Sequence, residues 1–410
     1  MKPKRLSLFL MIDACGWEIV RNDPFLQKVA PHRHRLRSVF GYSSACVPSI
    51  LSGRWPDEHG NWCYFVHDPD NTPFRGLSWL RWFPKALTGR RIVRRLLTKL
   101  VKNQLGFEGY FDLYNIPFQH IHRYDFTEKK SPLRPGGMNR GENIFDTLTQ
   151  RQVPHFTSDP TKSEEENRDE LLAQIGEGKI EFAFVYWAGL DGLLHRVGNE
   201  SPEIPARLRV YEQWIEQVER LAGECYEGVD LYVFSDHGMA NCDVHLDLAK
   251  VIEALPLRFG TDYTVVYDST MARFWFAHDE ARRLVEEALA TVSQGRIVPE
   301  TELRELRAPV DDRRFGELFF LVDEGVLIVP SHMGERPIRA MHGYHPDAPQ
   351  SYATLFTNRA ELPCEVTDIP HIHRLMLESI QPQSNNSPSQ HEPHHRPEYA
   401  AFVRRFLVTA

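Results

Sequence analysis

The stretch "LSLFLMID" (Leu6–Asp13) is a run of mostly apolar residues that ends in a carboxylate. Two later stretches share this design: "EFAFVYWAGLD" ends at Asp191, and "VDLYVFSDH" ends at Asp236 and His237. Continuous apolar runs bounded by turn signals are typical of strands that are buried on both faces. The three stretches therefore predict central strands of one sheet, each followed by polar side chains at its carboxyl end.

Helical patterns alternate with these strands. They are "GENIFDTLTQ" (141–150), "SEEENRDELLAQI" (163–175) and "IPARLRVYEQWIEQVERLAG" (204–223). Alternating strands and helices indicate an α/β fold in which helices cover both faces of a mostly parallel sheet. Ligands of such sheets bind beyond the carboxyl ends of the strands, which is where the polar residues fall.

Two regions interrupt this alternation. Residues 62–124 are rich in aromatic residues and arginine and are predicted to form an insertion over the sheet edge. Residues 271–332 have the pattern of a strand, a helix and then a hairpin, which predicts a small α+β cap. The remaining segments are predicted as core (1–61, 125–270 and 333–378), a flexible proline-rich linker (379–396) and a C-terminal helix (397–410).

A basic amphipathic helix is predicted within the insertion, at "GRRIVRRLLTKLVKNQL" (89–105). Its apolar residues form one helical stripe, and arginines and lysines occupy the other faces. Such a helix can lie on an anionic membrane or hold an anionic substrate. The alternative is a cap helix that packs its apolar stripe on the core. The apolar residues are Ile92, Val93, Leu96, Leu97, Leu100 and Val101.

The composition excludes several classes of protein. A net charge of -8 over 410 residues argues against a general nucleic-acid binder, and no stretch approaches the roughly 18 apolar residues of a membrane span. The apolar run near the N-terminus reaches Asp13 too soon for a signal peptide and lacks a cleavage site. The six cysteines are scattered without a CxxC pair, so we expect reduced thiols and a cytoplasmic protein.

Several histidines and carboxylates have the spacing of metal ligands. Asp191 and His195 are four residues apart, which places both on one face of a helical turn. Adjacent Asp236 and His237 point in different directions and can serve two neighbouring ions, and Asp13 and His342 add to the set. Zinc and manganese accept such mixed carboxylate and imidazole ligands.

The order of these motifs resembles that of the alkaline phosphatase superfamily, and within it the type I phosphodiesterase and nucleotide pyrophosphatase family. The motifs are the Asp13 strand end, "GYSS…SG…PDEHG" (41–60), "DGLLH", "SDHG" and "HGY". The resemblance implies a three-layer αβα sandwich with a mostly parallel central sheet and inserted cap elements. It also implies two divalent ions, commonly zinc. One ion would be held by Asp191, His195 and His342, and the other by Asp13, Asp236 and His237.

The family's nucleophile is a Thr or Ser, or in sulfatases a modified Cys, at the start of a helix. In the family pattern it precedes the glycine of a "TG" or "AG" pair by ten positions, so "SG" ending at Gly53 indicates Ser43. Ser44 remains an alternative. Cys46 is a second one, because "CVPS" imitates the start of the sulfatase pattern C-x-P-S-R, although Ile50 replaces its arginine.

The predicted activity is hydrolysis of phosphate esters through a phosphoseryl intermediate. Phosphodiesterase relatives place an asparagine four residues after "HG", where this chain has Tyr64; Asn61 is the predicted substitute for binding phosphate. The expected substrate is a small-molecule or lipid- or glycan-linked phosphate ester, with peripheral membrane contact through the basic helix. The alternatives are a phosphomonoesterase, a sulfatase that uses modified Cys46, and an inactive metal-binding protein.

Overall fold

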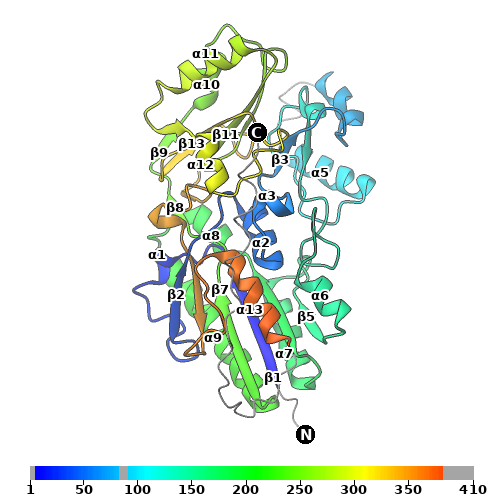
Figure 1. Cartoon of the computed structure of the whole chain (residues 1–410), viewed down its shortest axis with the longest axis vertical. Helices are drawn as coiled ribbons and strands as arrows, with labels where there is room; N and C mark the ends of the chain where they lie inside the picture. Colours follow the sequence, from blue (N-terminus) through cyan, green and yellow to red (C-terminus); the bar gives the residue numbers. More distant parts are fainter. Residues whose placement is uncertain (1–4, 83–90, 382–410) are drawn as a thin grey trace, which may run out of the picture. The chain divides into compact units, whose positions relative to one another are not determined.

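The computed structural model describes residues 5–82 and 91–381. Its central sheet has six strands, and β1 pairs in parallel with both of its neighbours. The first strand of the chain therefore lies in the middle of the sheet, and the predicted mostly parallel sheet is confirmed. Only β16 runs in the direction opposite to the other five strands, so it is antiparallel to both of its neighbours, β2 and β7. The order is β2 (His32–Leu36), β16 (Ala353–Thr357), β7 (Gly228–Phe234), β1 (Arg5–Ile12), β6 (Phe182–Trp187) and β5 (His155–Thr157) (Figure 1).

Helices cover both faces of this sheet because alternate residues of each strand point to opposite sides. Leu8 and Leu10 pack with one group of helices, and Phe9 and Met11 pack with the other. The first group is α1 (Trp17–Val20), α7 (Glu164–Glu177), α8 (Gly189–Val197) and α9 (Glu203–Cys225). The second is α2 (Ser43–Ser52), α6 (Ile144–Gln150) and α13 (Ile372–Ser379) (Figure 1). The αβα sandwich is therefore confirmed.

A second, antiparallel sheet forms the cap. Its order is β10 (Tyr263–Tyr267), β11 (Met271–Phe276), β13 (Leu318–Val322) and β12 (Gly295–Ile297), and α10 (Leu248–Glu253) and α11 (Asp279–Leu289) pack on it. The predicted cap starts at residue 271, but its sheet already starts at Tyr263. Residues 268–270 are the turn between β10 and β11, which pair with each other. Helix α12 (Glu300–Glu305) packs instead with the cluster around α2.

The hairpin expected at the end of the cap does not form. Both edges of β13 are already paired, one with β11 and the other with β12. The following strand, β14 (Val326–Ile328), therefore pairs with β9 (Val244–Leu246). Next to it, β15 (Ala340–Met341) pairs with β8 (Ala240–Asn241) and leads the chain to His342.

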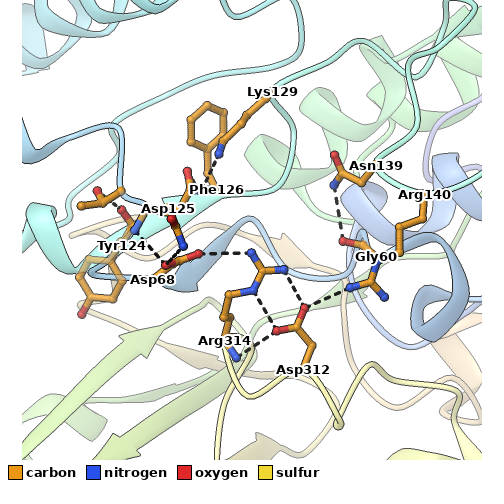
Figure 2. A network of polar contacts seen from close by, with 12 residues as sticks. Gly60, Asp68, Tyr124, Asp125, Phe126, Lys129, Asn139, Arg140, Asp312 and Arg314 are labelled. Carbon is orange, nitrogen blue, oxygen red and sulfur yellow. Dashed lines mark hydrogen bonds and ion pairs between the residues drawn. The ribbon is translucent and has the colours of Figure 1, made fainter.

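The insertion begins and ends at one antiparallel pair, β3 (Phe65–His67) with β4 (Tyr124–Phe126). Between these strands lie η1 (Arg75–Trp82), α5 (Arg91–Leu105) and η2 (Ile121–Arg123). An aromatic cluster fills its interior and includes Trp275 of the cap. Figure 2 shows the polar contacts at the same junction, in which Arg314 of the cap pairs with Asp68 at 3.3 Å and with Asp312 at 2.8 Å. Cap and insertion are therefore joined by both apolar and charged contacts.

Among residues 5–82 and 91–381, no helix is both long and apolar enough to cross a membrane. Ser379, the first residue of the predicted linker, ends α13. The rest of that linker beyond residue 381 and the predicted helix 397–410 lie outside the described residues.

Candidate metal and nucleophile site

Three neighbouring strands of the central sheet direct polar side chains to one place. Asp13 directly follows β1, Asp236 is the second residue after β7, and Asp191 lies in α8 just after β6. The turns after β1 and β7 lie in contact because Gly16 and Gly238 have no side chains: a Cβ on Gly16 would stand 2.4 Å from the Cα of Gly238. Two glycines thus allow the carboxylates of neighbouring strands to approach one another.

The first ligand group consists of Asp191, His195 and His342. The Oδ1 atom of Asp191 lies 3.3 Å from His195 Nε2 and 3.7 Å from His342 Nε2. His195 Nδ1 lies 2.8 Å from the carbonyl oxygen of Ala340, and a neutral ring donates its proton there. The Nε2 lone pair of His195 then faces the carboxylate, as in a metal-binding histidine whose other nitrogen is held by a carbonyl.

The second group consists of Asp13, Asp236 and His237. The Nε2 atom of His237 is 3.4 Å from Asp13 Oδ1 and 3.2 Å from Asp236 Oδ2, and its Nδ1 is 2.9 Å from the carbonyl of Gly238. The other oxygen of Asp236 accepts backbone N–H groups from Ala14 at 3.3 Å and from His237 at 3.1 Å. These bonds hold the carboxylate so that Oδ2 faces the histidine.

The donor atoms of both groups fit divalent cations. Oδ1 of Asp13, Oδ1 of Asp191 and Oδ2 of Asp236 are buried, and none has a hydrogen bond among the described residues. Buried polar atoms are normally paired, so three unpaired carboxylate oxygens facing histidine lone pairs call for positive charge between them. Asp13, Asp191 and His237 also lie within 4.8 Å of one another through their ligand atoms, so the two groups adjoin.

The acidity of these groups reflects the crowding of negative charge. Burial, together with the charges of Asp236 and Asp191, raises the pKa of Asp13 well above its usual range. Burial also raises the pKa of Asp236 to about 7. Burial acts in the same direction on Asp191, but the neighbouring histidines, His195 above all, outweigh it and lower the pKa of that carboxyl. Cations bound between these residues would stabilise all three ionised forms.

Ser43 lies beside the second group as the first residue of α2. Its Oγ is 3.1 Å from His237 Nε2. Ser44, the next residue, is turned away and donates a hydrogen bond to the carbonyl of Trp62 at 3.1 Å. Cys46 is fully buried in the core against Ser38, and burial raises the pKa of its thiol well above the usual range. Of the three candidate nucleophiles, only the Ser43 side chain contacts a ligand group.

Asn61 and Tyr64 follow the "HG" pair and differ in their contacts. Asn61 is buried, and the Oδ1 atom of its side-chain amide has no hydrogen bond among the described residues. The Tyr64 hydroxyl accepts the N–H of Asp112 at 2.7 Å and donates to its carbonyl at 3.1 Å, so it is already engaged. Asn139 donates to the Gly60 carbonyl at 3.5 Å and fixes the start of this segment (Figure 2).

Two tyrosines at this site are not among the residues expected from the sequence. The Tyr186 hydroxyl donates to Oδ2 of Asp13 from the neighbouring strand. The Tyr42 hydroxyl lies 2.8 Å from Thr270 Oγ1. The Thr270 hydroxyl in turn donates to the carbonyl of Gly343 at 2.8 Å. Tyr42 thus connects the start of α2 to the residue after His342. A tyrosine at the end of a buried strand, as at 186, is the one signal that the sequence offers.

Comparison with known proteins gives a family. Residues 7–345 match the family model described as type I phosphodiesterase / nucleotide pyrophosphatase. A search of curated proteins found no match. Human ectonucleotide pyrophosphatase / phosphodiesterase 5 superimposes with a TM-score of 0.63 at 14% identity, covering 94% of this chain and 97% of that one. The murine protein gives 0.61 at 16% identity, covering 92% and 94%. An inactive variant of it in complex with AMP gives 0.62 at 14% identity, covering 92% and 95%.

Proposed function

The chain belongs to the type I phosphodiesterase / nucleotide pyrophosphatase family of the alkaline phosphatase superfamily, and from this membership we propose a two-step hydrolysis of phosphodiesters through Ser43. The family consists of metal-dependent hydrolases that act on small-molecule phosphate esters such as nucleotides. The proposal adds the nucleophile, the covalent intermediate and the number of ions.

Two divalent cations, zinc or manganese, are proposed cofactors. The unpaired carboxylate oxygens and the histidine Nε2 atoms that face them support this assignment. Bound cations supply Lewis-acid charge that favours the ionised serine and draws charge from the phosphate oxygens. The proposed ligands are Asp191, His195 and His342 for one ion, and Asp13, Asp236 and His237 for the other.

Ser43 is the proposed nucleophile because its Oγ touches the second ligand group. This contact is the observation that carries the proposal. Oγ loses its proton as it forms a bond to phosphorus, the bond to the leaving alkoxide breaks, and the alkoxide takes up a proton in exchange. Water then cleaves the phosphoserine ester, which releases the monoester and restores the hydroxyl. The N-terminus of α2 supplies a favourable field for the phosphate.

Asn61 is the proposed donor to a phosphate oxygen. The Asn61 N–H donates to His59 Nδ1 at 3.1 Å, which fixes the backbone, while the buried Oδ1 of the side-chain amide has no hydrogen-bond partner among the described residues. The neighbouring Trp62 carbonyl accepts a hydrogen bond from Ser44, so this segment lies against the start of α2. The amide is therefore close to the residues that would hold the phosphate.

The proposed substrates are small-molecule phosphodiesters, including lipid- or glycan-linked ones, and not nucleic acids. The net charge of -8 supports the exclusion of nucleic acids. A phosphomonoesterase is the second candidate, because Tyr64 replaces the asparagine of phosphodiesterase relatives and its hydroxyl is engaged by Asp112. A cytoplasmic location stays a prediction.

The test compares wild type with Ser43→Ala, Ser43→Thr and Ser44→Ala in the presence of zinc or manganese. The substrates are bis-p-nitrophenyl phosphate, p-nitrophenyl phosphate and p-nitrophenyl sulfate. We expect the diester to be cleaved fastest, Ser43→Ala to lose roughly 1,000-fold or more in kcat, and the other two variants to retain activity. Activity of Ser43→Ala at the wild-type level would refute the assignment, and a preference for the monoester would favour the second candidate.

A further inference from the structure

Helix α5 presents an apolar row to solvent although it already has a buried face. Val101 is buried and Leu97 is half-buried against the aromatic cluster of the insertion. Ile92, Leu96 and Leu100 follow one another at single-turn spacing and are 74%, 59% and 64% exposed. The single apolar stripe expected from the sequence is thus divided between the core and the surface. Packing of α5 on the core leaves the exposed row unexplained.

The orientation of α5 is fixed by polar contacts on its inner side. Arg94 donates to the carbonyl of Ile116 at 3.2 Å and lies over the ring of Phe118 at 4.5 Å. Lys102 donates to the carbonyl of Gly109 at 2.7 Å. Since both cations are held from within, the helix cannot turn its exposed apolar row inward without breaking these contacts.

Positive charge flanks the apolar row. Arg95 and Lys99 are exposed, and neither has an ion-pair partner among the described residues. The segment 91–105 contains only basic residues among its charged ones, in a chain whose net charge is -8. In the preceding η1, Trp79 and Trp82 are also exposed. Aliphatic residues flanked by cations and accompanied by tryptophan are typical of surfaces that enter the interface of an anionic bilayer.

We propose that Ile92, Arg95, Leu96, Lys99 and Leu100 form a docking face for anionic phospholipid membranes. An anionic bilayer offers charge opposite to Arg95 and Lys99 and an apolar layer for the aliphatic row. A second copy of the chain fits less well, since a two-fold interface centred on this face would bring the same cations together.

The docking face is connected to the candidate site. Thr98 on the inner side of α5 donates to Asp112 Oδ1 at 3.2 Å, and the Asp112 backbone binds the Tyr64 hydroxyl. Tyr64 lies three residues after Asn61. Docking would therefore hold the lipid surface on a helix that contacts, through Asp112 and Tyr64, the segment bordering the site. Docking and hydrolysis remain separable, because vesicle binding is measured without turnover.

The experiment measures co-sedimentation of the full chain with phosphatidylcholine vesicles and with phosphatidylcholine vesicles containing phosphatidylglycerol, at low and high salt. Leu96→Gln/Leu100→Gln removes apolar contacts and keeps good helix formers. Arg95→Gln/Lys99→Gln removes the cations. Its matched control is Arg282→Gln/Arg283→Gln on α11, which removes two charges from another exposed helix. Circular dichroism and hydrolysis of a soluble ester report that each variant is folded.

We expect wild type and the α11 control to bind the anionic vesicles and high salt to weaken binding. Leu96→Gln/Leu100→Gln should lower the partition coefficient at least about tenfold. Arg95→Gln/Lys99→Gln should lower it roughly 20- to 30-fold, since each basic residue near an anionic surface contributes about fivefold. Wild type that ignores anionic lipid, or a leucine variant that binds as wild type does, overturns the proposal. A wild type that forms a dimer, together with a leucine variant that stays monomeric, also overturns the proposal, because a second copy of the chain would then cover the face.

Discussion

Acidification from pH 7.5 to 5.0 should destabilise the folded protein through His59. Its ring is fully buried, Nδ1 accepts the N–H of Asn61 at 3.1 Å, and Nε2 lies 2.9 Å from Ser49 Oγ. Because Nδ1 is the acceptor, the neutral ring carries its proton on Nε2 and donates it to Ser49. Burial, with a smaller contribution from the charge of Arg54, lowers the pKa of His59 to about 3.

The size of the effect follows from the difference between the folded and unfolded states. Histidine in an unfolded chain has a pKa of about 6.5, so the unfolded state binds the proton first as the pH falls. The stability that the neutral ring contributes is complete above pH 6.5 and is lost progressively as the pH falls toward 3. Between pH 7.5 and 5.0, the loss due to His59 alone is about 2 kcal/mol.

Urea unfolding of wild type and His59→Asn at the two pH values measures this loss. The asparagine can still accept the Asn61 N–H but does not titrate, and the other buried histidines are present in both proteins. Wild type should therefore lose about 2 kcal/mol more than the variant on acidification. Equal losses in the two proteins would refute the reasoning that His59 is held neutral by its surroundings.

Three further perturbations test other parts of the molecule. Tyr42→Phe should lower the free energy of unfolding by about 1–3 kcal/mol in urea, because the buried Thr270 N–H loses its acceptor, and kcat should fall with it. Arg273→Met should lower the free energy of unfolding by about 3–5 kcal/mol, since it leaves Asp268 buried and unpaired. The double variant Arg273→Met/Asp268→Leu should recover most of this loss, and a double variant as unstable as the single one would contradict the explanation. Chelation should lower the melting temperature, because the site carboxylates then face one another without cations. Added zinc or manganese should restore it. A melting temperature that does not change with chelator would count against a metal site.

The positions of the central strands and of their polar ends follow directly from the sequence. Strands buried on both faces need continuous apolar runs, so Asp13 and Asp236 stand out where those runs end. His195 follows from its four-residue spacing after Asp191. His342 has no such local signal, because β15, which leads to it, is only two residues long, and its assignment came from the family resemblance.

Other features depend on three-dimensional context that periodicity does not contain. A helical stripe shows which residues of α5 are apolar, but not which part of a wide stripe meets the core. Here Leu97 packs against the core, whereas Leu96 faces solvent. The run at Val326–Ile328 has strand character, but its partner depends on whether the edges of β13 are free. From the sequence, Tyr186 is expected to be an ordinary core residue. Only the register of β6 with β1, which pairs Tyr186 with Met11, shows that its hydroxyl reaches Asp13.

The central claim is that Ser43 becomes covalently bound to phosphorus during turnover. The most direct measurement is mass spectrometry of protein that is denatured with acid while it hydrolyses bis-p-nitrophenyl phosphate with zinc or manganese. A phosphoryl ester that still carries one p-nitrophenyl group should appear on the peptide spanning residues 38–54, and fragmentation should assign it to Ser43. It should be missing from Ser43→Ala. An adduct assigned to Ser44 or Cys46, or turnover by Ser43→Ala at the wild-type rate, would contradict the account.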